Sequence, residues 1–295
     1  MVGVDFDFAR YVAYRRGMIE QRAREGGAYA YSGERKVRRT LGAARPVTLA
    51  IEATTRLWKS AAKDDLLAGA TRATDQDVPR LYRAQHAASL SLACPAPPVY
   101  ALPAESSIRA QAVGTDDDCT LLIGADVIDA LTDRELVAVV GHELGHVQNN
   151  HVLYATALFY LQYSSALFVR WIVQPAVMTL QAWSRRAEIT CDRAALIATR
   201  DLDATLSAMV KVALGPERAA ETDVQEYLRE LPKTQRGLSK YGELFRSYPY
   251  LPKRTQALEL FAKSQFYRKL TGGEMGEALS AEDVDTQVAD ILSVF

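Results

Sequence analysis

The chain has 295 residues, enough for one large domain or two modest domains with a substantial core. Its 35 basic and 36 acidic residues give a formal net charge of -1, so bulk charge suggests no nucleic-acid partner. Three irregularly spaced cysteines build no disulfide framework and fit a reducing compartment. The first residues lack a basic region followed by an apolar run, so we expect no secretory signal and a cytoplasmic location.

The N-terminal third is predicted to be helical. Residues 5–90 are rich in alanine and arginine, and 48–70 should form one long amphipathic helix that ends at Gly69. The stretch from Arg10 to Arg45 is locally basic. A solvated helical face is the favoured interpretation, and contact with an acidic membrane or nucleic acid is the alternative.

A proline-rich segment at 94–98 indicates a linker. Three strands should follow, near 99–102, 108–113 and 119–123, and everything after residue 124 is predicted to be helical. The fold class is therefore α+β and mainly helical. We divide the chain into an N-terminal helical region (1–93), a central domain (94–271) and an acidic C-terminal tail (272–295).

A helix is predicted to begin at Thr132. Thr132 and Glu135 form a capping box, with Thr132 at the N-cap and Glu135 at the third helical position. An apolar stripe follows at helical spacing, made of Leu136, Val139, Val140, Leu144 and Val147. This stripe should pack the helix into a core.

The same helix carries His-Glu-Leu-Gly-His at 142–146. Residues four apart share one face of a helix, so His142 and His146 can bind one metal ion together. Glu143 lies on nearly the same side, where it can take a proton from a water activated by the metal. The alternative is a buried helix that happens to carry two hydrogen-bonded histidines.

Residues 152–169 are uncharged, about the shortest span that crosses a bilayer as a helix. Several tyrosines, serines and a glutamine dilute this segment, and Arg170, Gln174 and Pro175 interrupt it. A buried helical hairpin is the favoured interpretation. Membrane association through 152–183 is the alternative.

A catalytic zinc usually has three protein ligands and one open position, so a third ligand is needed. His151 should point away from the pair as a helix-surface or cap residue, and His86 is interpreted as a packing or surface histidine. Glu188 and Asp192, four residues apart on a helix that Pro175 should open, are better candidates. Glu188 would complete the site, and Asp192 could fix the tautomer of a ligand histidine.

Two alternatives to this ligand set remain open. Glu188 and Asp192 could form a solvated helical face and pair with Arg185 and Arg193. Cys191 could be a soft ligand, although Glu188 has the better helical phase and a small buried thiol is the simpler interpretation.

Beyond Gly272-Gly273 the chain is acidic, and residues 281–294 form an amphipathic pattern. The apolar side of this pattern consists of Val284, Val288, Ile291 and Leu292. The segment should pack back on the body, with docking to a partner or to the cleft as the alternative.

Together, the pentapeptide at 142–146 and the Glu188-x-x-x-Asp192 element resemble the HtpX-like and CAAX-prenyl-protease-like family of gluzincin zinc metallopeptidases. The resemblance runs from about Pro97 to Leu260. It implies a zincin-like core with a small sheet beside the zinc helix and one zinc ion per chain. It also implies the roles of the site residues: ligands His142, His146 and Glu188, general base Glu143, and supporting residue Asp192.

Two departures from the family pattern bear on activity. The family carries a His-Pro pair followed by arginine near the site; here Tyr248 replaces the histidine, and Arg254 is the matching arginine. Tyr248 could donate a hydrogen bond to an oxyanion, or it could be a packing residue. The family's Asn-Ala on the edge strand, which would align a peptide by strand addition, is also absent from 109–114.

The sequence therefore predicts a zinc-dependent endopeptidase that acts on polypeptides, with Glu143 as general base. A zinc-binding scaffold that recognises unfolded polypeptide without cutting it is one alternative. A latent processing protease that needs a partner is another. The oligomeric state is not predicted.

Overall fold

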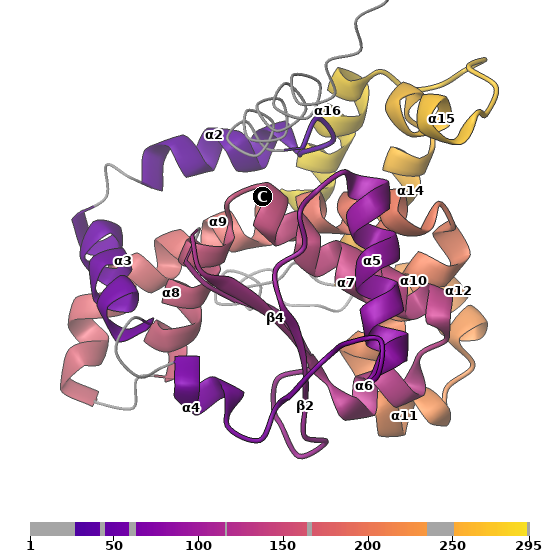
Figure 1. Cartoon of the computed structure of the whole chain (residues 1–295). Helices are drawn as coiled ribbons and strands as arrows, with labels where there is room; N and C mark the ends of the chain where they lie inside the picture. Colours follow the sequence, from indigo (N-terminus) through magenta and orange to yellow (C-terminus); the bar gives the residue numbers. More distant parts are fainter. Residues whose placement is uncertain are drawn as a thin grey trace, which may run out of the picture.

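The computed structural model describes residues 27–41, 45–58, 63–115, 117–163, 167–234 and 251–293. Over these ranges the fold is α+β and mainly helical, which confirms the predicted class (Figure 1). The sheet has four strands in the order β1 (Thr71–Arg72), β2 (Val99–Leu102), β4 (Cys119–Gly124) and β3 (Ala110–Gly114). Three strands lie where the sequence predicted them. The missed strand, β1, is two exposed residues, too short to show a period of two.

The two ends of the sheet are β1 and β3. Strand β2 pairs with β4 in parallel, whereas the β1–β2 and β3–β4 pairs are antiparallel. Alternate residues of β4 point to opposite faces, as strand geometry requires. Leu121 and Ile123 pack into the main core with α5 (Pro79–Leu92), and Leu122 packs with Trp58 on the other face.

The N-terminal helices are shorter than predicted. The structure has α2 (Ser32–Leu41), α3 (Arg45–Leu57) and α4 (Lys63–Leu67), so the prediction of one helix over 48–70 is wrong. Residues 59–62 lie outside the described ranges. The backbone does turn at Gly69, whose φ of +77° is a conformation that glycine adopts without strain.

The predicted start of the helix that carries His142 and His146 is confirmed. Helix α7 (Asp133–Gln148) begins after Thr132, whose side chain accepts from the Glu135 amide, while the Glu135 carboxylate accepts from the Thr132 amide. Leu136, Val140 and Leu144 of the predicted stripe have no exposed surface. The buried face of α7 packs on the sheet, on α5 and on α9 (Leu167–Thr199).

Two glycines let α7 approach α9 closely. A Cβ atom at Gly145 would lie 2.8 Å from the Cβ of Ala194 and 3.0 Å from the Cα of Cys191. At Gly141 it would lie 2.6 Å from the Cβ of Ala198. The helices are therefore in contact at distances that only glycine permits on the α7 side.

Helix α9 does not begin at Pro175 as predicted, because Pro175 lies inside it. A proline there removes one backbone hydrogen bond of the helix. The helix nevertheless starts at Leu167 and continues through Glu188 and Asp192 to Thr199. The shared helical face of Glu188 and Asp192, which the prediction needed, is unaffected.

The remaining helices surround this core (Figure 1). They are α6 (Ala125–Ala130), α8 (Val152–Tyr163), α10 (Leu202–Leu214), α11 (Pro216–Ala220), α12 (Val224–Thr234), α14 (Leu251–Ala262), α15 (Gln265–Thr271) and α16 (Ala281–Leu292). None of the helices in the described part of the chain is both long enough and apolar enough to cross a membrane. The division of the chain at 93/94 and 271/272 stays a prediction.

The C-terminal helix packs back on the body. Val284 and Val288 of α16 are buried in a cluster with Tyr31, Ile189 and Ala257. The Arg193 guanidinium lies 2.7 Å from the Asp285 carboxylate, which also accepts from the Ser32 amide at 2.9 Å. The amphipathic pattern thus buries its apolar side against α2, α9 and α14.

Glu135 links the start of α7 to α10 and makes stability depend on pH. Burial alone would raise its pKa, but hydrogen bonds from Lys211, Ser207 and Thr132 outweigh burial and lower it. Glu135→Gln should therefore cost about 1–3 kcal/mol of unfolding free energy near neutral pH. A lowered folded-state pKa gives stability that is present above the unfolded value of about 4.3 and is lost as pH falls through the folded value.

Urea unfolding between pH 3 and 8 measures this difference. Glu52→Gln is the matched control, because Glu52 is exposed and lies 3.8 Å from Arg56; it should change stability by less than about 0.5 kcal/mol. A Glu135→Gln deficit that stays constant down to pH 3 would contradict the assignment.

Candidate metal centre

The two histidines of α7 converge on one carboxylate of α9. The Nε2 atom of His142 lies 3.5 Å from one oxygen of Glu188, and the Nε2 atom of His146 lies 3.6 Å from the other. Side chains of all three are largely buried, with 16, 10 and 7 % of their surface exposed. The structure thus brings together the three residues that the sequence selected as metal ligands.

Each of these two distances, which reach different oxygens of Glu188, is near the spacing of ligand atoms around a zinc ion. Zinc binds imidazole nitrogen and carboxylate oxygen at about 2.0–2.2 Å, so ligand atoms around a tetrahedral ion are about 3.3 Å apart. The observed 3.5 and 3.6 Å separations are close to that value and long for direct hydrogen bonds. Two nitrogens and one oxygen are also a common donor set for catalytic zinc.

Asp192 holds the other side of the His142 ring. Its carboxylate lies 3.1 Å from Nδ1 of His142, so Nε2 is the atom left for a metal. Burial alone would lower the pKa of His142, but the hydrogen bond with Asp192 and the nearby Glu188 carboxylate raise it to about 10. For His146, burial lowers the pKa to about 3 and keeps the ring neutral, the form that binds metal.

Arg254 of α14 neutralises the two buried carboxylates. It donates to Asp192 at 2.9 and 2.6 Å and lies 3.1 Å from Glu188. Burial alone would raise the pKa of Glu188, but Arg254 and His142 lower it to about 2. Both carboxylates are buried against Arg254, which does not fit the alternative of a solvated helical face. The recorded partner of Arg193 is Asp285.

Glu143 lies between α7 and the edge strand. Its side chain accepts a hydrogen bond of 2.6 Å from the Ala112 amide of β3. Burial raises its pKa to about 7, with the nearby His142 and Arg254 acting in the opposite direction. A carboxylate with a pKa near neutrality can both accept and return a proton.

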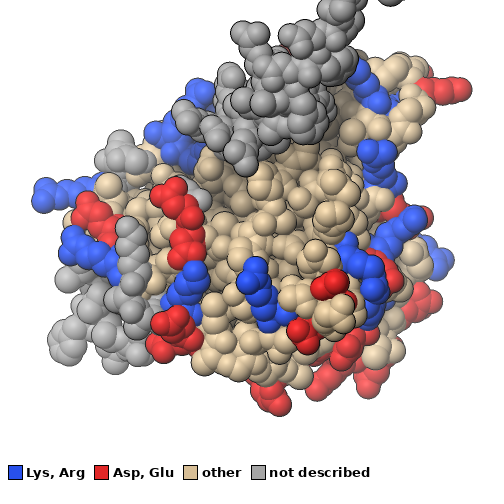
Figure 2. Space-filling view, viewed as in Figure 1, with Lys and Arg blue, Asp and Glu red and all other residues tan. Residues whose placement is uncertain are grey.

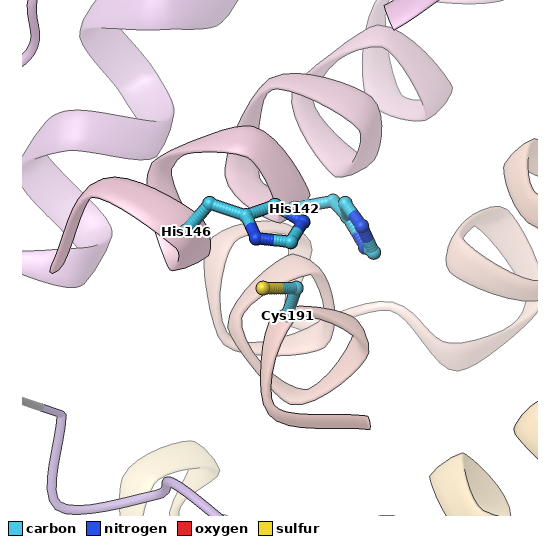
Figure 3. Close-up of side chains that lie close together, drawn as sticks. All are labelled: His142, His146 and Cys191. Atoms are coloured by element: carbon cyan, nitrogen blue, oxygen red, sulfur yellow. The ribbon is translucent and has the colours of Figure 1, made fainter. Parts of the chain in front are cut away.

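Cys191 lies close to the same centre. Its Sγ atom and ring nitrogens of His142 and His146 are within 4.8 Å of one another, and Figure 3 shows the thiol below the His146 ring. We favour Glu188 over Cys191 as third ligand. Burial raises the pKa of Cys191 well above its usual value, so the thiolate that binds metal is disfavoured, whereas the Glu188 carboxylate is already ionised. The Cys191 thiol is buried with no exposed surface, as expected, and its interpretation as a packing residue instead of a ligand stays a prediction.

The prediction for His151 is wrong. Helix α7 ends at Gln148, and Asn150 has a positive φ of 55°, so the chain turns back instead of continuing around the helix. His151 is fully buried beside His146 and Trp183, with ring centroids 5.4 and 5.3 Å away. By contrast His86 lies on the exposed side of α5, one of the two positions expected for it.

Two residues remain to be compared with the prediction: Tyr248, which was predicted, and Glu34, which was not. Tyr248 lies outside the described residues, so its role stays a prediction. Glu34 of α2 is only 1 % exposed and lies 3.4 Å from His151. The burial of Glu34 was not predicted, because Glu34 stands in a basic stretch that was interpreted as a solvated face. The Ala112 contact also had no signal, since it uses a backbone amide.

A four-stranded mixed sheet lies beside a helix whose two histidines meet a glutamate of a later helix, and this arrangement is that of a zincin-like metallopeptidase fold. The family comparison is specific: the model of peptidase family M48 matches residues 75–262, more than half of the chain. The chain therefore belongs to peptidase family M48, as an HtpX-like member, which confirms the resemblance found in the sequence.

Curated relatives share the same region. The chain is 34% identical over 114 residues to the plastoglobule-localized metallopeptidase 48 of Arabidopsis thaliana, covering 37% of this chain and 33% of that protein. It is 27% identical over 179 residues to a protease HtpX homolog of Bifidobacterium longum, covering 50% and 58%. One from Tropheryma whipplei is 28% identical over 157 residues, covering 52% of each. The chain thus spans a third to somewhat over half of these relatives. No solved structure matches.

Removing Arg254 should destabilise the protein, because Asp192 and Glu188 are buried carboxylates that it compensates. Arg254→Met keeps much of the side-chain volume but leaves Asp192 and Glu188 without their cation. We expect a loss of about 3–5 kcal/mol in metal-free protein, measured by urea unfolding in chelator. Added zinc should restore part of this stability, because the ion supplies positive charge. Arg56→Met, at a side chain 82% exposed, is the control; equal effects of the two changes would refute this account.

Gly145→Ala tests whether the close contact of α7 and α9 positions the ligands. Alanine favours an unobstructed helix by about 0.5–1 kcal/mol, so the change would stabilise the protein if space allowed. Because the added methyl meets Ala194 and Cys191, we expect instead a loss of about 1–3 kcal/mol and weaker zinc binding. Thermal unfolding and chelator competition measure both. Gly276→Ala, with nothing within 4 Å of the new methyl, should be neutral, and a stabilising Gly145→Ala would disprove the constraint.

Proposed function

We propose that this chain is a zinc-dependent endopeptidase that holds one zinc ion through His142, His146 and Glu188. The observation that supports this most strongly is the convergence of both Nε2 atoms on the Glu188 carboxylate at 3.5 and 3.6 Å. Membership of a peptidase family supports the same class of activity. When bound, zinc would polarise the scissile carbonyl and lower the pKa of water toward neutrality.

Glu143 is the proposed general base. Its pKa of about 7 suits a group that takes a proton from water and gives it to the leaving amine. The Ala112 amide holds one carboxylate oxygen at 2.6 Å, which fixes the orientation of the side chain and leaves the other oxygen for the proton. The proton transfer therefore takes place next to the edge of the sheet.

The substrate class we propose is polypeptide in an extended conformation. Strand β3 is at the edge of the sheet, and its Ala112 and Gly114 amides donate to Glu143 and Thr156 instead of to β4. That edge therefore faces the candidate site. Because these two amides are already used, an extended peptide would pair through the other backbone groups of this edge, which would bring a scissile bond beside Glu143. The family's Asn-Ala pair is not needed for this backbone pairing.

Two residues support the reaction in this proposal without binding metal. Arg254 and Asp192 keep His142 oriented through the contacts at 2.6–3.1 Å. Tyr248 keeps its predicted role as a hydrogen-bond donor to the oxyanion, with packing as the alternative.

On the face in Figure 2, acidic and basic side chains are interspersed around a broad area of uncharged residues. This distribution agrees with a neutral or mixed polypeptide substrate better than with a polyanion.

Glu143→Gln separates chemistry from metal binding. The amide cannot act as a base, so we expect hydrolysis of unfolded casein to fall by at least about 100-fold while zinc content stays near one per chain. Glu188→Ala, in contrast, should lower zinc content as well, because it removes a ligand. Casein cleavage and metal analysis by atomic emission measure the two effects.

Glu217→Gln is the matched control, since Glu217 lies on α11, away from the metal centre. Wild-type turnover in Glu143→Gln would refute the role of the base. A zinc-loaded wild type that binds unfolded casein without cutting it would favour the scaffold alternative.

A further inference from the structure

A second group of polar side chains is buried behind His146. We call Glu34, His151 and Cys191 the buried relay. His151 and Cys191 have no exposed surface, and Glu34 has 1%. Nδ1 of His151 lies 3.7 Å from Sγ of Cys191, and its Nε2 lies 3.4 Å from the Glu34 carboxylate. The reaction proposed above uses none of these three residues.

One end of the buried relay is the Glu34 carboxylate, which its neighbours keep ionised. Glu34 accepts a hydrogen bond of 3.0 Å from the indole N–H of Trp183, which is also fully buried. Burial alone would raise the pKa of Glu34, but the neighbouring His151 ring and the hydrogen bond from Trp183 lower it. A buried carboxylate of this kind needs donors, and the relay provides one of them.

The other end of the relay faces an unsatisfied atom. Among the described residues, Nδ1 of His146 and Nε2 of His151 are both buried and neither makes a hydrogen bond; Nε2 of His151 is 3.4 Å from the Glu34 carboxylate. If Nε2 of His146 binds a metal, the neutral ring carries its proton on Nδ1, and that N–H needs an acceptor. Cys191 Sγ lies within 4.8 Å of a nitrogen of this ring and, in Figure 3, under its Nδ1 side.

We propose that Cys191, His151 and Glu34 position His146 as a metal ligand, by a hydrogen-bond relay that runs from its Nδ1–H to the Glu34 carboxylate. The thiol accepts from His146 and donates its S–H to Nδ1 of His151. The Nε2–H of His151 then donates to Glu34. This inference rests on the proposed metal site, and it gives His146 the support that Asp192 gives His142.

The donors and acceptors of the relay balance without any proton being added or removed. His146 and His151 are both neutral, Cys191 remains a thiol, and Glu34 carries the single negative charge. Each ring has one N–H and one bare nitrogen, and each faces a group of the opposite kind. A sulfur atom is a weak acceptor, so His146 is held less firmly than a carboxylate would hold it.

The relay also ties the metal centre to the N-terminal part of the chain. Glu34 belongs to α2, and the same segment contacts the end of α7, since the Gly27 amide donates to the Asn149 side chain at 2.9 Å. Arg38 of α2 donates to the Asn149 carbonyl as well. Residues before the span that matches the family thus contribute to the environment of a ligand.

Substitutions at Cys191 test the relay through metal affinity. Cys191→Ala removes the acceptor and should weaken zinc binding by about 10–100-fold in chelator competition. Cys191→Ser restores a group that both accepts and donates, so it should bind zinc within a few-fold of the wild type. Cys94→Ala and Cys94→Ser are matched controls, because Cys94 is a buried thiol next to Pro95, outside the candidate centre. Thermal unfolding of the metal-free variants separates loss of fold from loss of affinity.

Nitrogen-15 NMR of the zinc-loaded wild type gives a readout that packing alone would not produce. We expect the His146 proton on Nδ1 and the His151 proton on Nε2. A His151 proton on Nδ1, or Cys191→Ala with wild-type affinity, would overturn the relay. A sulfur-to-metal absorption band in the cobalt-substituted wild type would also overturn it, because Cys191 would then be a ligand. These measurements do not depend on hydrolysis. A protein that binds zinc but does not cut casein would therefore refute the proposed activity and leave the relay intact.

Discussion

The contact between α7 and α9 is the constraint on which the candidate centre depends. Ligands on separate helices meet only if the helix axes come close, and here Gly141 and Gly145 leave room for Ala198 and Ala194. The histidines alternate with these glycines along α7. The same turns of the helix therefore provide both the ligands and the contact that brings Glu188 to them. A larger side chain at either glycine would push α7 and α9 apart and so move Glu188 away from His142 and His146.

Electrostatics imposes the second constraint. Two carboxylates in a water-poor interior are costly unless cations compensate them. Arg254 contacts both Asp192 and Glu188, and His142 contacts both as well. The two carboxylates of α9 are therefore compensated by groups from two other helices, α7 and α14, that are far away in the sequence. This arrangement keeps Glu188 ionised and ready to bind a cation even before one is present.

Local patterns in the sequence were enough to predict the parts of the site that lie on one element. The capping box at Thr132, the pair His142 and His146, and the four-residue spacing of Glu188 and Asp192 each depend on helical periodicity alone. Arg254 could be assigned only through the family resemblance, because its contact with Asp192 spans 62 residues.

Features that depend on where a helix ends could not be predicted. His151 was expected to continue the α7 periodicity, but the helix stops three residues earlier and the chain reverses at Asn150. Pro175 was expected to open α9, but the helix begins at Leu167 and contains the proline. The burial of Glu34 arises from tertiary contacts with His151 and Trp183, which no local pattern encodes.

The ion pair of Arg193 and Asp285 links the C-terminal helix α16 to the buried part of α9. Arg193 is 4% exposed, directly follows Asp192 in the sequence, and stacks over the ring of Phe261 at 5.0 Å. A chain shortened before α16 would leave this guanidinium inside the protein with its counter-ion gone, one residue from the group that orients His142. Helix α16 therefore supports the part of the fold that holds the candidate metal centre. Removing α16 would destabilise that part of the protein.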